Sequence, residues 1–221
     1  DTPIYGQIQL NKVDGATLKA LPGVTFTIYD SANKSIGTYT TDSSGTVKVK
    51  LTYGNYFWQE TGAPENYVID DASMHGFSIT TNNQVLEYNV KDTPIYGQVQ
   101  LEKIDAATLK ALPNVTFTIY DSGKQAIGKY TTDSSGIVKV RLPYGNYYWQ
   151  ETNSPVNYLV DDTSMHSFSI TTNDQLLTYT VKDTPIYGQI QLNKVDGATL
   201  KALAGVTFTI YDSANKSIGT Y

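Results

Sequence analysis

Lys12, Glu60 and Asp92 place one amine and two carboxylic acids in stretches of alternating polar and apolar residues. The apolar residues that precede them in these alternating series are Ile8 and Leu10, Tyr56 and Trp58, and Leu86, Tyr88 and Val90. Successive side chains of a β-strand point to opposite faces, so residues two apart share a face. The spacing therefore predicts that all three ionisable groups point into an apolar interior.

A second copy of this arrangement lies further along the chain. Lys103, Glu151 and Asp183 each continue an apolar face in the same way. Lys48 and Lys50 behave differently, because they alternate with apolar residues and are predicted to face water. The inward lysines are thus a particular feature of two strands and not a general property of lysine in this sequence.

Burying an isolated charge costs several kcal/mol, so an inward lysine must meet the inward acids. One solution is a buried ion triad. The other is covalent: Lys12 Nζ attacks the Asp92 carboxyl carbon, water leaves, an amide forms, and Glu60 shuttles the protons. Desolvation lowers a lysine pKa and raises a carboxyl pKa, which makes a neutral amine and a protonated acid accessible.

An internal repeat organises the elements that carry these residues. The sequence DTPIYGQ begins at Asp1 and returns at Asp92 and Asp183, a period of 91 residues. We predict complete domains at 1–92 and 93–183 and a truncated third repeat at 184–221. A shifted frame with units at 40–130 and 131–221 is the alternative.

Alternation and turn signals predict about seven strands in each repeat. In the first repeat they are expected at residues 7–14, 24–29, 35–40, 46–51, 55–60, 77–80 and 85–91. Seven short strands in about ninety residues are typical of an antiparallel, Greek-key sandwich of the immunoglobulin or prealbumin type. The predicted fold class is all-β, as tandem β-sandwiches.

Composition excludes several classes of protein. The net charge is −5 and the 16 Lys and Arg residues are scattered, which argues against a nucleic-acid partner. The chain has no cysteine, so disulfides, thiol catalysis and thiolate metal sites are excluded. No apolar run is long enough for membrane insertion. We expect no cofactor, no metal and no enzyme activity on an outside substrate.

Three motifs together resemble the Cna B-type, prealbumin-like domains of Gram-positive adhesins and pilins. Lys12 ends the sequence GQIQLNK at 6–12, Glu60 begins ETGAPENY at 60–67, and Asp92 begins DTP at 92–94. Three departures from the family pattern are Asn66 and Asn157 in place of Gly, Ser154 in place of Ala, and Asp in place of the commoner Asn at the bond.

The resemblance implies intramolecular isopeptide bonds in an extracellular, cell-wall-anchored stalk, whose signal and anchor lie outside this chain. The implied bonds are Lys12–Asp92 and Lys103–Asp183, with Glu60 and Glu151 as the catalysts. Lys194, the equivalent lysine of the third repeat, has no partner acid in the chain. We expect adjacent repeats to be neighbours, and the truncated repeat to dock on a neighbouring chain or unit.

Other interpretations remain open at this point. The triads could be non-covalent salt-bridge networks, or Glu60 and Asp92 could be a glycosidase pair, although an inward lysine between them argues against it. A ligand-binding adhesin module for a host protein or glycan, using Phe57 or Tyr148, is the alternative function. His75 and His166 supply too few ligands for a metal and are expected in a solvated loop. Calcium binding at the Asp pairs 70–71 and 161–162 is a less favoured alternative.

Overall fold

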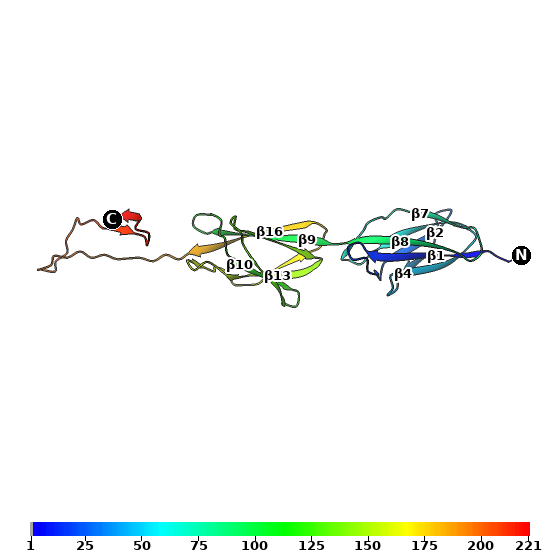
Figure 1. Cartoon of the computed structure of the whole chain (residues 1–221), viewed down its shortest axis with the longest axis horizontal. Coiled ribbons are helices and arrows are strands. Elements are labelled where there is room, and N and C mark those ends of the chain that lie inside the picture. Colours follow the sequence, from blue (N-terminus) through cyan, green and yellow to red (C-terminus); the bar gives the residue numbers. More distant parts are fainter. Residues whose placement is uncertain (1) are drawn as a thin grey trace. The chain divides into compact units, whose positions relative to one another are not determined.

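The computed structural model describes residues 2–221, and over these residues the regular structure consists of strands, with no helix. Asp1, the first residue of the first predicted domain, lies outside the described residues. Two compact units are present, Asp1–Pro185 and Ile186–Tyr221. The first unit holds four four-stranded sheets and the second a two-stranded sheet (Figure 1). The all-β prediction is confirmed, and no helix in this range could span a membrane.

Two sheets form the first repeat, one with the strand order β4-β1-β8-β6 and the other with the order β3-β2-β5-β7. The strands are β1 (Tyr5–Asp14), β2 (Thr25–Asp30), β3 (Ser35–Thr40), β4 (Thr46–Thr52), β5 (Gly54–Gly62), β6 (Tyr67–Ile69), β7 (His75–Ile79) and β8 (Gln84–Pro94). Ile8 and Leu10 of β1 share one apolar core with Phe26 of β2 and Trp58 of β5, so the sheets pack as a sandwich. Lys48 and Lys50 are exposed, as predicted.

The second repeat has the same topology, with strand orders β12-β9-β16-β14 and β11-β10-β13-β15. Its strands are β9 (Tyr96–Asp105), β10 (Thr116–Asp121), β11 (Ala126–Thr131), β12 (Ile137–Pro143), β13 (Gly145–Asn153), β14 (Tyr158–Leu159), β15 (His166–Ile170) and β16 (Gln175–Pro185). A separate apolar core, which includes Val99, Phe117 and Trp149, lies between its sheets.

Two details of each repeat differ from the sequence-based prediction. A short eighth strand, β6 or β14, was missed because two or three residues are too few to show alternation. The first and last strands, β1 and β8, pair in parallel, whereas an antiparallel sandwich was expected. A parallel pair needs a long connection between its strands, and here the six intervening strands provide that connection.

Parallel pairing fixes where the ends of a repeat lie. The register runs from Gly6 opposite Gln84 to Asp14 opposite Asp92. The chain therefore enters β1 at one end of the sandwich and leaves β8 at the other. Residues near the ends of both strands, including Lys12 and Asp92, lie at the exit end.

The unit Ile186–Tyr221 shows how much a strand depends on its neighbours. Residues 187–196 have the same sequence as β1, YGQIQLNKVD, yet they form no extended strand. The strands of this unit are β17 (Thr209–Tyr211) and β18 (Ser217–Thr220). Ile190 and Leu192, whose counterparts in β1 are fully buried, are 66% and 44% exposed. Without counterparts of β4 and β8 beside them, residues 187–193 have no sheet partner within residues 2–221. The backbone pairing of this segment is confined to the turn that follows it, where Val195 bridges Ala202.

Gly45 lies in the turn before β4 and brings the backbone close to Lys12. Its carbonyl accepts a hydrogen bond from Lys12 N at 2.7 Å. Its φ is +72°, and a Cβ placed there would lie 2.5 Å from the Lys12 carbonyl oxygen. Gly136 repeats this geometry against Lys103. Gly23 also has a positive φ, +81°, but a Cβ added there would have no atom within 4 Å.

We expect Gly45→Ala to destabilise the first repeat far more than Gly23→Ala. Both substitutions carry the strain of a positive φ, about 1–2 kcal/mol, but only Gly45→Ala adds steric overlap, about 1–3 kcal/mol more. Amide hydrogen exchange over residues 8–14, with residues 99–105 of the unchanged repeat as the internal reference, measures the difference. Equal acceleration of exchange in the two variants would contradict the close approach.

Candidate functional site

Lys12 lies near the end of β1 with its side chain inside the core. Burial alternates along β1, so Ile8, Leu10 and Lys12 share the inward face, and each has 0% of its surface exposed. This is the face predicted from the sequence. The amine at the end of this side chain has no access to water and depends on protein groups for compensation.

Glu60 lies in the opposite sheet, near the end of β5, and this residue is 1% exposed. Tyr56 and Trp58 precede it on the same face, and Trp58 packs edge-on against Phe26 with 5.8 Å between the ring centroids. Lys12 Nζ reaches across the core and lies 2.5 Å from Glu60 Oε2. The amine thus links the two sheets.

Asp92 lies on β8, beside β1 in the same sheet, and has no exposed surface. Lys12 is paired with Val90 and Asp14 with Asp92, so Lys12 and Asp92 are diagonal neighbours. Lys12 Nζ lies 2.6 Å from Asp92 Oδ1. The backbone N–H of Asp70 also donates to Asp92 Oδ1, at 3.2 Å. The structure brings the amine and both acids together.

The second repeat builds the same group from Lys103, Glu151 and Asp183. Lys103 Nζ lies 2.6 Å from Glu151 Oε2 and also donates to Asp183 Oδ1. Lys103 and Asp183 are fully buried, and Glu151 is 2% exposed. Two copies of one geometry follow from two copies of one alternating pattern.

Burial changes the protonation of the two glutamates. It raises the pKa of Glu60 to about 7; a hydrogen bond with Asp92 adds to the rise, and Lys12 opposes it. It likewise raises the pKa of Glu151 to about 7, against the opposing effect of Lys103. A glutamate with such a pKa exchanges protons readily near neutral pH.

Asp183 is shifted in the other direction. Burial acts to raise the pKa of Asp183, but hydrogen bonds from Lys103, Ser154 and Glu151 outweigh it and hold the pKa below its ordinary value. One acid of the second triad therefore retains its proton more readily than the other. Near neutral pH, Glu151 is therefore the acid of the pair that still carries a proton to transfer.

A further carboxylate, Asp14, closes the exit end beside the triad, and it was not singled out from the sequence. Its Oδ2 accepts a hydrogen bond from Tyr67 Oη at 2.7 Å, and its Oδ1 accepts bonds from the backbone N–H groups of Ala16 and Thr17. The Tyr67 hydrogen bond is the main cause that lowers the pKa of Asp14. Its position two residues after Lys12 was the available signal, because alternation puts both side chains on one face.

The two histidines singled out from the sequence pair with side chains outside the triads. His75 stacks on Trp58 with 4.1 Å between ring centroids, and its Nε2 lies 3.1 Å from Asp71 Oδ2. His166 repeats this contact with Trp149. Within residues 2–221 no cluster of three His, Asp or Glu side chains is arranged to hold a metal.

Lys194, the third equivalent lysine, is exposed. Its backbone carbonyl accepts a hydrogen bond from Leu203 N, as that of Lys12 does from Leu21 N. No ion pair involves Lys194 in the part of the chain that the structure describes. Its local turn is preserved, whereas the buried surroundings of Lys12 are not.

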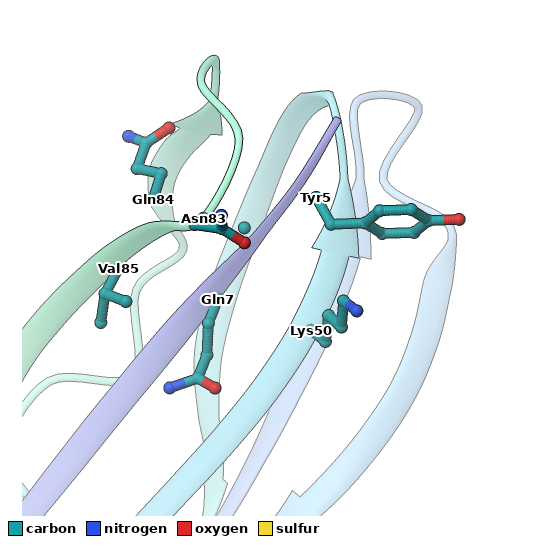
Figure 2. A pocket seen from close by; sticks show the side chains of 7 residues that line it. Tyr5, Gln7, Lys50, Asn83, Gln84 and Val85 are labelled. Carbon is teal, nitrogen blue, oxygen red and sulfur yellow. The ribbon is translucent and has the colours of Figure 1, made fainter. Parts of the chain in front are cut away.

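A shallow hollow lies at the entry end of β1, seven residues from Lys12 along the strand (Figure 2). The Tyr5 ring projects from the ribbon here, and Lys50 Nζ lies 4.7 Å from its centroid. Arg141 lies over Tyr96 in the same way in the second repeat. A cation on an aromatic ring stabilises the surface locally, and none of the triad residues lines the hollow.

Comparison with known proteins gives one family and several relatives. A family model named SpaA and described as a prealbumin-like fold domain matches residues 6–94 and 97–185. The serine-aspartate repeat-containing protein E of Staphylococcus aureus (strain USA300) is 30% identical, over 56% of this chain and 12% of its own length. The chain thus spans a small part of that curated relative.

Solved structures agree with the family model. "The Bacillus anthracis TIE protein" superposes with a TM-score of 0.77 and 34% identity, covering 82% of this chain and 34% of that one. A C-terminal fragment of the pilus adhesin SpaC from Lactobacillus rhamnosus GG has a TM-score of 0.61 at 15% identity, covers 84% of this chain and 99% of that one, and shows the shared fold. Because the family model matches both complete repeats, the chain belongs to the SpaA prealbumin-like fold domain family, as the three sequence motifs predicted.

Proposed function

We propose that this chain is a stalk or spacer segment of a Gram-positive surface protein, in which each complete repeat is locked by a self-formed isopeptide bond. The proposed bonds are Lys12–Asp92 and Lys103–Asp183, with Glu60 and Glu151 as the catalytic acids. The observation that carries the proposal is the fully buried lysine amine within 2.6 Å of two acids in the first repeat, and its repetition in the second.

The proposed reaction balances without any outside reagent. The Lys12 ammonium gives one proton to an Asp92 oxygen, which leaves a neutral amine facing a neutral acid. Nζ then attacks Cγ, the Nζ–Cγ bond forms, and a second nitrogen proton passes through Glu60 to the departing oxygen. The Cγ–O bond breaks, water leaves, and the third proton stays on the amide nitrogen.

The fold provides three conditions for this condensation that aqueous solution does not: alignment of the groups, a dry site and a glutamate that transfers protons. Aligned groups in contact react with effective molarities on the order of 10⁵ M or more. A dry site disfavours the ion pair relative to the neutral pair. The pKa of Glu60, about 7, lets this residue donate a proton and take one back near neutral pH. Each domain would act once, on itself, and an outside substrate could not reach groups that are 0–2% exposed.

The strand pairing supports a stalk function. Tension on a repeat enters at the start of β1 and leaves at the end of β8, because these strands are parallel neighbours. A bond between Lys12 and Asp92 would carry that tension past the residues between them. It would close a loop of 80 residues, and by analogy with a disulfide the chain-entropy stabilisation is on the order of 4–5 kcal/mol.

The near-identity of the repeats favours a spacer. Residues 183–221 match residues 1–39 except that Ala204 replaces Pro22. Repetition of one unit adds length without adding a new surface. We further propose an extracellular position, with neighbouring repeats of the same protein as the immediate partners and with the anchor to the cell wall in another part of the protein.

The intact mass of the purified chain tests the crosslinks. We expect the mass to be lower than the sequence mass by two waters, because each amide releases one. Glu60→Ala and Glu151→Ala should each restore one water, and the double variant should restore both. Glu87→Ala, which changes an exposed glutamate of β8, is the matched control and should keep the deficit of two. A wild-type mass equal to the sequence mass would refute the proposed bonds.

The pH dependence of bond formation tests the role assigned to the glutamates. Their raised pKa, about 7, means that the protonated form persists in the folded site below pH 7 and is lost above it. The rate constant should therefore fall above about pH 7, approaching about tenfold per pH unit if only the protonated form reacts. The protein is made by cell-free synthesis, incubated at pH values from 5 to 9 and denatured after different times. Mass spectrometry then measures the fraction of molecules that have lost water.

Folding must be separated from crosslinking in that experiment. Tryptophan fluorescence, followed in parallel at each pH, reports formation of the cores around Trp58 and Trp149. A crosslinking rate that stays level from pH 5 to pH 9, with folding unchanged, would show that protonated glutamate is not required.

A further inference from the structure

The two triads differ in one contact at the attacked carboxyl group. In the second repeat, Ser154 Oγ donates a hydrogen bond to Asp183 Oδ2 at 2.5 Å. The equivalent residue of the first repeat is Ala63, which has no hydroxyl. Asp92 Oδ2 is buried, and no hydroxyl or N–H group among residues 2–221 donates a hydrogen bond to it. The same oxygen thus has a fixed donor in one repeat and lacks it in the other.

The position of Ser154 explains how it reaches this oxygen. It follows directly after β13, which carries Glu151, and it precedes Pro155 in the connection to β14. Its side chain is half-buried. Lys103 Nζ and the backbone N–H of Asp161 donate to the other oxygen, Oδ1. The donors are therefore divided between the two oxygens of Asp183.

This division distinguishes the oxygen that leaves from the oxygen that stays. Oδ1 faces the amine and receives its proton, so it is the oxygen that departs as water when the Cγ–Oδ1 bond breaks. Oδ2 carries the negative charge once Nζ has added to Cγ, and it becomes the amide oxygen. A donor to Oδ2 is then an oxyanion donor for the tetrahedral intermediate.

We propose that Ser154 is a catalytic residue of the second repeat, whose hydroxyl stabilises the Oδ2 oxyanion and makes the Lys103–Asp183 bond form faster than the Lys12–Asp92 bond. The inference rests on the proposed isopeptide reaction and adds to it a difference in rate between the repeats. In the first repeat, no hydroxyl or N–H group among residues 2–221 donates to the equivalent oxygen.

The expected gain in rate depends on how much the negative charge on Oδ2 increases during the reaction. A carboxylate already places about half a charge on Oδ2, so Ser154 also stabilises the ground state. Charge becomes concentrated on Oδ2 only as the intermediate forms. Only the difference in stabilisation between these two states accelerates the reaction. We therefore expect a rate gain of about three- to tenfold, which is less than an oxyanion donor provides when it makes no hydrogen bond in the ground state.

A reciprocal exchange in the full chain tests the proposal. Chain from cell-free synthesis is folded, sampled over time and digested, and mass spectrometry counts the crosslinked peptides of each repeat, which differ at Asn11 and Glu102. Ser154→Ala should slow the second repeat about three- to tenfold, and Ala63→Ser should accelerate the first. Ser154→Thr, which keeps a hydroxyl, should restore most of the rate.

Matched controls separate catalysis from folding. Asn153→Gly gives the adjacent position the residue found in the first repeat, Gly62, and leaves the hydroxyl in place, so the rate should not change. Folding of each variant is followed by tryptophan fluorescence. A purely structural role would slow folding and crosslinking together and would not respond to Ala63→Ser.

The outcomes distinguish the two proposals. If neither repeat loses water in the wild-type chain, the isopeptide function fails and the Ser154 proposal fails with it. If both repeats crosslink but Ser154→Ala reacts at the wild-type rate or faster, only the role of Ser154 is overturned. Slower crosslinking in Ser154→Ala at an unchanged folding rate, with the gain in Ala63→Ser, supports it.

Discussion

The burial of one amine between two acids is the constraint on which the rest of each repeat depends. A lysine with no exposed surface would be strongly destabilising alone, so Lys12 requires Glu60 from the opposite sheet and Asp92 from the neighbouring strand of its own sheet. These contacts need a particular separation of the sheets and a particular register of β1 against β8. The turn at Gly45 and the hydrogen bond between Tyr67 and Asp14 close the structure around the amine at the same end.

Much of this site was predictable because alternation is a property of each strand by itself. The faces of β1, β5 and β8 can be assigned from Leu10, Trp58 and Val90 without knowing the fold, and the three inward charges then have to meet. Alternation does not report which strands are neighbours or in which direction they run. The parallel pairing of β1 with β8, the short strand β6 and the closure by Tyr67 depend on contacts between distant segments and were therefore not predicted.

The sequence YGQIQLNKVD occurs twice in the chain, and its two copies separate what local signals determine from what contacts with distant segments determine. In residues 5–14 it is a strand, and in residues 187–196 it is not. The turn that follows it forms in both places, since Asp14 and Asp196 each accept hydrogen bonds from the backbone N–H groups two and three residues later. Local signals are thus sufficient for the turn, whereas the strand requires neighbours. Ser154 illustrates a related limit, because its departure from the family pattern was visible in the sequence but the oxygen it contacts was not.

The diagonal placement of Lys12 and Asp92 on adjacent strands has a topological consequence. With the proposed bond in place, each repeat becomes a covalent ring whose two tails start from neighbouring points, Lys12 and Asp92, at the exit end of the sandwich. The N-terminal tail runs back along β1 to the entry end. A single cut of the backbone anywhere between residues 13 and 91 would open the ring but leave both tails joined through the amide. A surface protein built from such rings would remain one molecule after one nick by a host protease in every repeat.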